Sequence, residues 1–116
     1  MIRLTLPLAP SINHYFARNG NRTYLPAKVR EYRQEVADIV AAAGHATLEG
    51  RLSVFMAVHM PTKRRADIDN RAKGALDALT HAGVWVDDEQ VDELTLVRQE
   101  IIKGGRMVVL ITEREM

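Results

Sequence analysis

Apolar and polar residues alternate in several short stretches of the chain. In IRLTL, residues 2–6, every second residue is apolar, which predicts a half-buried strand. The same period of two in RLSVFMAVHM, residues 51–60, predicts a second strand. Residues 94–102 and 106–112 are predicted as two more strands, and we expect the KGG turn between them to join them as a hairpin.

Two other stretches carry apolar residues at helical spacing. Residues 28–43 place an apolar stripe on one face, and Gly44 follows as a stop signal. Residues 69–82 predict a second helix that ends before Gly83, and VWV after it is a candidate short strand. DDEQ then forms a turn or loop. The predicted order β-α-β-α-β-β, without VWV, indicates an α+β fold with helices packed on a small mixed sheet.

A long segment, residues 7–27, separates the first strand from the first helix. It opens with two prolines and contains NGN, so its composition is typical of turns. We expect an irregular loop here, and a structureless loop of this length in a compact domain is often functional.

Composition limits the class of protein. The chain has 116 residues, of which 47% are hydrophobic and 27% charged, so we expect one domain over residues 1–116. No apolar run approaches the roughly 20 residues that span a bilayer, and the N-terminus does not resemble a signal peptide. The absence of cysteine excludes disulfides and thiolate metal sites and suits a reducing cytoplasm, so we expect a cytoplasmic protein without a membrane partner.

Charge is distributed unevenly although the net charge is only +1. Residues 1–65 carry ten Lys/Arg and four Asp/Glu, whereas residues 66–116 carry six and eleven. A basic half can face a polyanion and an acidic half can hold a cation. Ordinary solvated charge explains the same asymmetry, and the asymmetry alone favours that explanation.

Two acidic clusters flank the second predicted helix. Asp67 and Asp69 precede or open it, and either can be an N-cap, but only one residue can occupy that position. Asp87 and Asp88 follow it, and we expect the chain to return along the helix and bring Asp88 toward the first pair. Three carboxylates would hold a hard cation such as Mg²⁺ or Mn²⁺. Spacing alone does not decide between this site and solvated caps and turns.

Basic and amide residues beside these acids have two interpretations each. Lys73, one turn after Asp69, can form an ion pair with it or stabilise charge on a metal-bound phosphate. Asn70 can orient a carboxylate or be a plain first-turn residue. The basic run just before the acids, which can contact phosphate or be a solvated loop, is Lys63, Arg64 and Arg65. Four scattered histidines and no cysteine disfavour zinc.

At these residues the chain resembles the RusA family of Holliday junction resolvases. Four segments carry the resemblance in order: LPLAPSINHYF, KVREYR, RADIDNRAKGALDALTHAGVW and VDDEQV, followed by KGGR. The resemblance covers nearly the whole chain, and the combined motif is far more specific than an Asp-x-Asp pair alone.

The resemblance implies a small homodimeric endonuclease, dependent on Mg²⁺ or Mn²⁺, that cuts four-way DNA junctions symmetrically in recombination and repair. By position, the metal-binding and catalytic aspartates are Asp67, Asp69 and Asp88, and the catalytic lysine is Lys73. Asp87 and Asn70 would support them. Some members have a basic residue directly before the first of these aspartates, where this chain has Ala66.

Further DNA contacts are expected from the segment 7–27, in which Asn13, Tyr15 and Arg18 can contact a DNA backbone or unstacked bases. A polar surface loop is the alternative for each. Trp85 is a candidate dimer contact, with burial in the core as the alternative. Other functions compatible with the residues are another structure-selective Mg²⁺-dependent nuclease, a non-catalytic nucleic-acid-binding module, and an interaction domain in which the basic and acidic halves pair between subunits.

Overall fold

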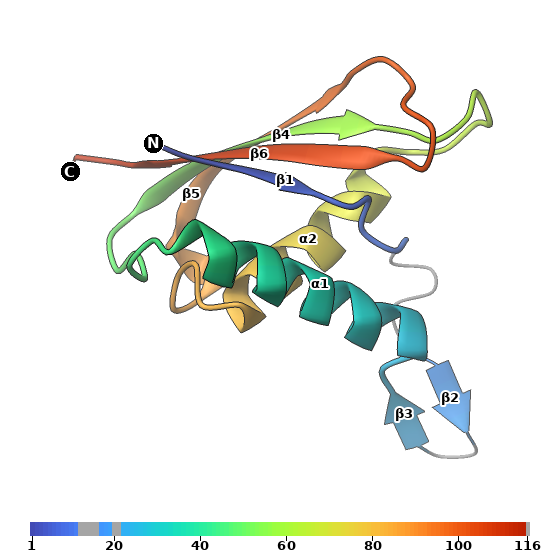
Figure 1. Ribbon diagram of the computed structural model, residues 1–116, viewed down its shortest axis with the longest axis horizontal. Coiled ribbons are helices and arrows are strands. Elements are labelled where there is room, and N and C mark those ends of the chain that lie inside the picture. Colours follow the sequence, from blue (N-terminus) through green and yellow to red (C-terminus); the bar gives the residue numbers. More distant parts are fainter. Residues whose placement is uncertain (12–16, 20–21, 116) are drawn as a thin grey trace.

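The computed structural model describes residues 1–11, 17–19 and 22–115. Its centre is a four-stranded sheet in the order β1-β6-β4-β5, and two helices cover one face of it (Figure 1). The sheet consists of β1 (Ile2–Leu6), β4 (Leu52–His59), β5 (Val91–Arg98) and β6 (Arg106–Glu113), and the helices are α1 (Ala27–Ala43) and α2 (Asp69–His81). This arrangement confirms the predicted α+β class and the predicted order of the main elements.

Both helices begin and end within one residue of their predicted positions. In α1, Val29, Tyr32 and Val36 are buried at helical spacing, and Gly44 ends the helix in the left-handed conformation with φ 69°. The buried face of α2 consists mainly of alanines, so this helix lies close to its neighbours. A Cβ atom added at Gly74 would be 3.2 Å from the carbonyl oxygen of Pro10. The segment around Pro10 therefore packs closely against α2.

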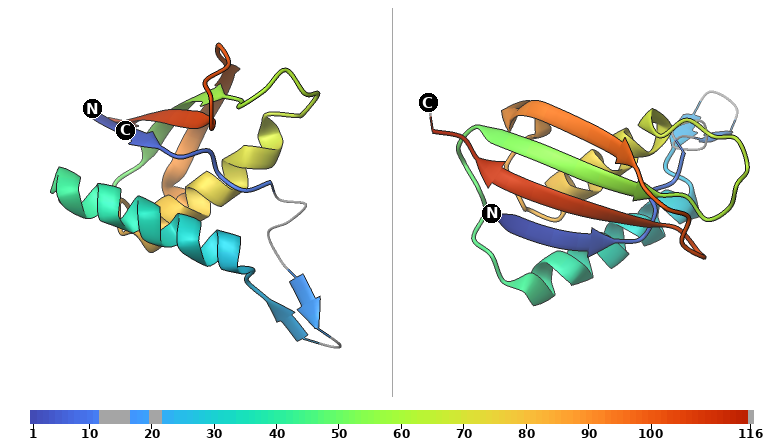
Figure 2. Two further views of the ribbon diagram at one scale, coloured as in Figure 1. Left: turned by 45° about the vertical axis from the view of Figure 1, so that its right-hand side comes forward. Right: turned by 90° about the horizontal axis from the view of Figure 1, so that it is seen from above.

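The sheet packs one face against the two helices, and no helix covers the other face. The side chains that face the helices form the core, among them Leu4, Leu6, Leu52, Val54, Met56, Val58, Met107, Val109 and Ile111. Neither helix covers the opposite face, which is seen from above in the right-hand view of Figure 2. The period-two pattern of the sequence follows directly from this one-sided burial.

The predicted hairpin between the last two strands is wrong. β4 lies between β5 and β6, pairing with β5 in parallel and with β6 antiparallel. The backbone N–H groups of Gln99 and Ile102 donate to the carbonyl oxygens of Val58 and Met60, so this connection crosses the end of β4 before β6 begins. The local KGG turn exists, but a local turn signal cannot distinguish a hairpin from a connection that passes over a third strand.

The prediction of an irregular loop over residues 7–27 is also wrong in part. β2 (Ala17–Asn19) and β3 (Arg22–Tyr24) form an antiparallel pair that projects from the N-terminal end of α1 (Figure 1). The hydroxyl of Tyr32 donates to the carbonyl oxygen of Pro7 at 2.9 Å, which fixes the beginning of this segment against α1. In the described part of the chain, no helix has the length and apolar character needed to cross a membrane.

Gly105 is expected to be less tolerant of substitution than its neighbour Gly104. Both have positive φ, at 77° and 83°, so alanine at either strains the backbone by about 1 kcal/mol. A Cβ at Gly105 would also lie 2.8 Å from Leu8 Cδ2, whereas one at Gly104 meets no atom within 4 Å. We expect Gly105→Ala to lower the free energy of unfolding by about 2–4 kcal/mol and Gly104→Ala by about 1 kcal/mol. Denaturant unfolding of both variants checks this, and equal losses would contradict it.

Candidate active site

The first acidic pair lies at the N-terminal end of α2, and neither member is a helix cap. Ile68 occupies the N-cap position with helical angles and no side-chain capping bond, and Asp69 is the first helical residue. Asp67 and Asp69 are exposed and make no hydrogen bond or ion pair within the described residues. The capping interpretation is therefore wrong, and the two carboxylates are free to bind a ligand.

A cleft of about 600 Å³ opens beside this end of the helix. Its lining is Ser11, Arg64, Arg65, Ala66, Asp67, Asn70 and Arg71. The loop on one side of the cleft is held by Arg98 of β5, whose Nη2 donates to the carbonyl oxygen of Ala66 at 2.6 Å. We call this space the basic cleft, because three of its lining side chains are guanidinium groups and one is a carboxylate.

Arg71 is a cleft residue that the sequence analysis did not identify. Its Nη1 donates to the carbonyl oxygen of Ala9 at 2.8 Å, and its buried Nε has no partner among the described residues. Burial lowers the pKa of the Arg71 guanidinium from its usual value. No sequence signal could have revealed this residue, because its place in the cleft depends on how residues 9–11 pack against α2.

Asp88 is positioned at the other end of α2 by a short 3₁₀ helix, Asp88–Gln90. Asp87 caps this turn by accepting a hydrogen bond from the backbone N–H of Glu89 at 3.1 Å. Asp87 is thus the cap of the turn that presents Asp88, and its supporting role in a metal site stays a prediction.

Gln90 fixes the turn to the rest of the fold and was also not identified from the sequence. Its Oε1 accepts from the backbone N–H groups of Val86 and Asp87, and its Nε2 donates to the carbonyl oxygens of Leu48 and Gly50. The side chain is buried with both its polar atoms bonded. The spacing Asp-x-x-Gln is a capping-box pattern, so the sequence did contain the signal.

Asp88 lies among groups that disfavour its charge. It lines a second cleft, of about 360 Å³, with Arg33, Asp77, Thr80 and His81. Burial raises the pKa of Asp88, the hydrogen bond with Asp87 and the charges of Asp77 and Asp87 raise it further, and Lys73 opposes the shift. A cation in this cleft would relieve the repulsion among the carboxylates.

Lys73 lies between the two acidic clusters on the exposed face of α2. Its Nζ is 3.5 Å from Asp77 Oδ2. The i,i+4 ion pair therefore forms with Asp77, whereas the sequence had suggested Asp69 as the partner. The sequence analysis omitted Asp77, although its spacing from Asp69 and Lys73 places all three on one helical face.

The three predicted metal ligands do not converge within one chain. Among residues 1–11, 17–19 and 22–115, no group of three or more Asp, Glu or His side chains is arranged to hold a metal ion. Asp88 is near Asp77. Asp77 follows Asp69 by eight positions in α2, which corresponds to about 12 Å along the helix axis. The expected return of Asp88 to the start of α2 is thus not seen, because β5 begins at the opposite end of the helix. Their assignment as metal ligands stays a prediction.

The remaining acids on this side are neutralised. Arg51 forms ion pairs with Glu89 and Asp92 at 3.1 and 2.6 Å, and Arg114 also contacts Asp92 at 3.1 Å. The Arg51 hydrogen bonds hold the pKa of Asp92 below its usual range, and Asp92 and Glu89 in turn raise the pKa of Arg51. This network leaves Asp88 as the acid of the second cluster that faces the cleft.

The other predicted contact residues fall into three groups. Lys63, Arg64 and Arg65 are exposed on the loop before α2, as a phosphate contact requires. Asn13 and Tyr15 lie outside the described residues, and of Arg18 only the backbone, in β2, is described. Trp85 is 1% exposed and donates to the Thr80 hydroxyl at 2.6 Å, so it is a core residue and not a dimer contact.

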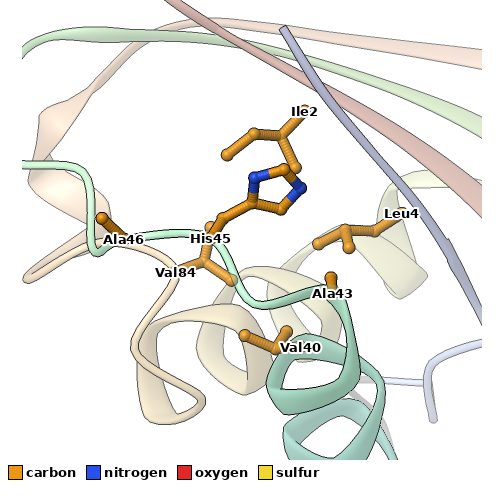
Figure 3. Close-up of a pocket in the computed structure, with 7 residues that line it drawn as sticks. All are labelled: Ile2, Leu4, Val40, Ala43, His45, Ala46 and Val84. Atoms are coloured by element: carbon orange, nitrogen blue, oxygen red, sulfur yellow. The ribbon is translucent and has the colours of Figure 1, made fainter.

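A small apolar pocket offers no alternative site. It lies between α1 and β1 and is lined by Ile2, Leu4, Val40, Ala43, His45, Ala46 and Val84 (Figure 3). Its volume of about 10 Å³ is close to the minimum for one water molecule, and its lining is apolar except for His45.

Comparison with known proteins gives one consistent result. Residues 6–112 match the family model described as endodeoxyribonuclease RusA. Over 111 residues, covering 95% of this chain and 92% of each relative, the chain is 42% identical to a protein of Escherichia coli K12, 41% to one of Shigella sonnei and 40% to one of Enterobacteria phage 82. Each is named crossover junction endodeoxyribonuclease RusA.

Replacing Asp88 by asparagine is expected to stabilise the metal-free protein at neutral pH. Folding raises the pKa of Asp88, so ionising this side chain lowers the free energy of unfolding of the protein. This loss of stability is absent below the pKa of the unfolded state and is complete above the pKa of the folded state. Asp88→Asn should therefore raise Tm at pH 7 by about 2–4 °C, equivalent to about 0.5 kcal/mol, with no gain near pH 3.

Thermal unfolding in EDTA at both pH values provides the measurement. Asp67→Asn is the matched control, because Asp67 is exposed and makes no hydrogen bond or ion pair among the described residues, and its Tm should not change. A lower Tm for Asp88→Asn at pH 7 would contradict the repulsion inferred for this cleft.

Proposed function

We propose, because the chain belongs to the RusA family of endodeoxyribonucleases, that it resolves four-way DNA junctions by paired cleavage of the phosphodiester backbone. The observation that carries this proposal is the match over residues 6–112, which includes both acidic clusters and the helix between them. Its relatives come from bacteria and a phage, and we propose that it acts in recombination and repair in the cytoplasm, where their DNA lies.

The proposed cofactor is Mg²⁺, for which Mn²⁺ can substitute. Asp67, Asp69 and Asp88 offer only carboxylate oxygens, the ligands that hard divalent cations prefer, and no cysteine competes. When bound, such an ion activates water and neutralises charge on a phosphodiester. Lys73 can stabilise negative charge on the phosphate after giving up its pairing with Asp77, and the arginines of the basic cleft can hold the DNA backbone.

A homodimer would supply what one chain does not bring together. Asp67 and Asp69 lie at one end of α2, and Asp88 lies with Asp77, Thr80 and His81 toward the other end. The rise from Asp69 to Asp77 alone is about 12 Å along the axis. A two-fold axis perpendicular to this helix makes two α2 helices antiparallel, so each first acidic pair lies beside the partner's second cluster. The same symmetry gives two sites for two opposed strands of a junction.

The first test compares DNA substrates and metals. With Mg²⁺ or Mn²⁺, the protein should cut a four-way junction at least tenfold faster than a flap or a linear duplex of the same sequence. EDTA should abolish cleavage, and Zn²⁺ should not restore it. Equal cleavage of all three substrates would indicate a different nuclease, and junction binding without cutting in any metal would indicate a non-catalytic module.

The second test asks whether each site is shared between subunits. Asp67→Asn and Asp88→Asn homodimers should both bind junctions in Ca²⁺ but fail to cleave in Mg²⁺. A mixed dimer of the two variants has one fully intact site if the ligands come from different chains, and no intact site if they come from one chain. Co-expression with two affinity tags gives the mixed dimer.

Recovery of strand nicking by the mixed dimer, at about half the parent rate per dimer, is expected. The matched control is a mixed dimer of Asp67→Asn with Asp69→Asn, which has no intact site if these two neighbours act together in one site. Activity in that control, or none in the test dimer, would rule out the shared arrangement.

A further inference from the structure

We propose that Arg71 binds a DNA backbone phosphate in the basic cleft, a role that rests on the proposed function. The sequence gives no reason to select this residue, because a charged side chain three positions into a helix is ordinary. The structure places it in the lining of the cleft, on the first turn of α2, with its Nη1 bonded to Ala9 of the neighbouring segment.

The contacts of Arg71 leave its charge without a counterion. Among the described residues, the only hydrogen bond of its side chain joins Nη1 to the neutral carbonyl oxygen of Ala9. Asp67 lines the same cleft but lies beyond ion-pair distance. Elsewhere in the described chain, Arg51 and Arg114 each pair with carboxylates. Burying part of a guanidinium group without a paired carboxylate costs free energy. An anion supplied by a ligand would offset this cost.

The geometry also explains why the anion should be a phosphate diester. The bond to Ala9 restricts the rotation of the guanidinium, so its unbonded Nη2 is held in one orientation before DNA arrives. Arg64 and Arg65 are exposed on the facing loop, and together the three guanidiniums can surround a single phosphate or two consecutive ones. Such contacts fix the position of DNA without reading its sequence.

Ala66 offers a position at which the charge of Arg71 can be replaced, because it lines the same cleft and its side chain ends at Cβ. An arginine at position 66 would place a new guanidinium in the cleft while leaving the Ala9 contact unrestored. The variant Ala66→Arg in an Arg71→Gln background therefore separates the charge of Arg71 from its structural bond.

The experiment measures the dissociation constants of the intact protein for a four-way junction and for linear duplex, in Ca²⁺ and over a range of salt concentrations. Arg71→Gln should weaken binding to both DNAs by about tenfold and reduce the slope of log K against log salt by about 0.9, the value for one lost phosphate contact. Adding Ala66→Arg should restore most of the affinity and slope. Arg3→Gln is the matched control, since it removes an exposed arginine from β1, outside the cleft, and should change the slope much less.

An unchanged affinity and slope for Arg71→Gln would overturn the inference. So would a loss of affinity that accompanies a lower Tm and is not recovered by Ala66→Arg, because that result identifies Arg71 as a structural bond to Ala9. The parent's preference for the junction over duplex tests the proposed function independently, since the effect of Arg71 is expected on both DNAs.

Discussion

The parallel pairing of β4 and β5 is the constraint on which the rest of the structure depends. Two parallel strands cannot be joined by a tight turn, so the chain must cross back over the sheet, and α2 makes that crossing. The residues before α2 therefore follow the carboxyl end of β4, and those after it precede the amino end of β5. Asp67 and Asp88 are held at opposite ends of one helix by the topology itself.

This separation changes how the acidic motif is understood. Considered as sequence, the two clusters form one signature, and three carboxylates in one place are the natural conclusion. In the folded chain the first pair is exposed and unpaired, while Asp88 lies in a separate cleft near Asp77. If the two clusters form one metal site, as proposed, each chain holds only part of it, and a second copy related by a two-fold axis would complete both sites without rearranging the fold.

Local sequence signals predicted what depends on local physics. The helix bounds, the glycine stops and the burial of alternate strand residues follow from periodicity and backbone freedom. The strand order did not follow, because KGG forms a turn whether or not the flanking strands pair. Gln90 was predictable from its capping-box spacing, whereas Arg71 was not, since the carbonyl oxygen that its side chain contacts belongs to Ala9, 62 positions away. Pairings between distant segments determine both the strand order and the positions of the acids.

The charges at the two ends of α2 complement each other in an antiparallel pair. The N-terminal end carries the three arginines of the basic cleft with Asp67 and Asp69, and the C-terminal end carries Asp77, Asp87 and Asp88 with Arg33 nearby. Two copies brought together as proposed would place a positive end beside a negative one, which favours this orientation over a parallel one. In such a dimer, the carboxylates of one copy would also compete with DNA for the arginines in the basic cleft of the other copy. A cation bound by these carboxylates would remove that competition, so metal binding and DNA binding should reinforce each other.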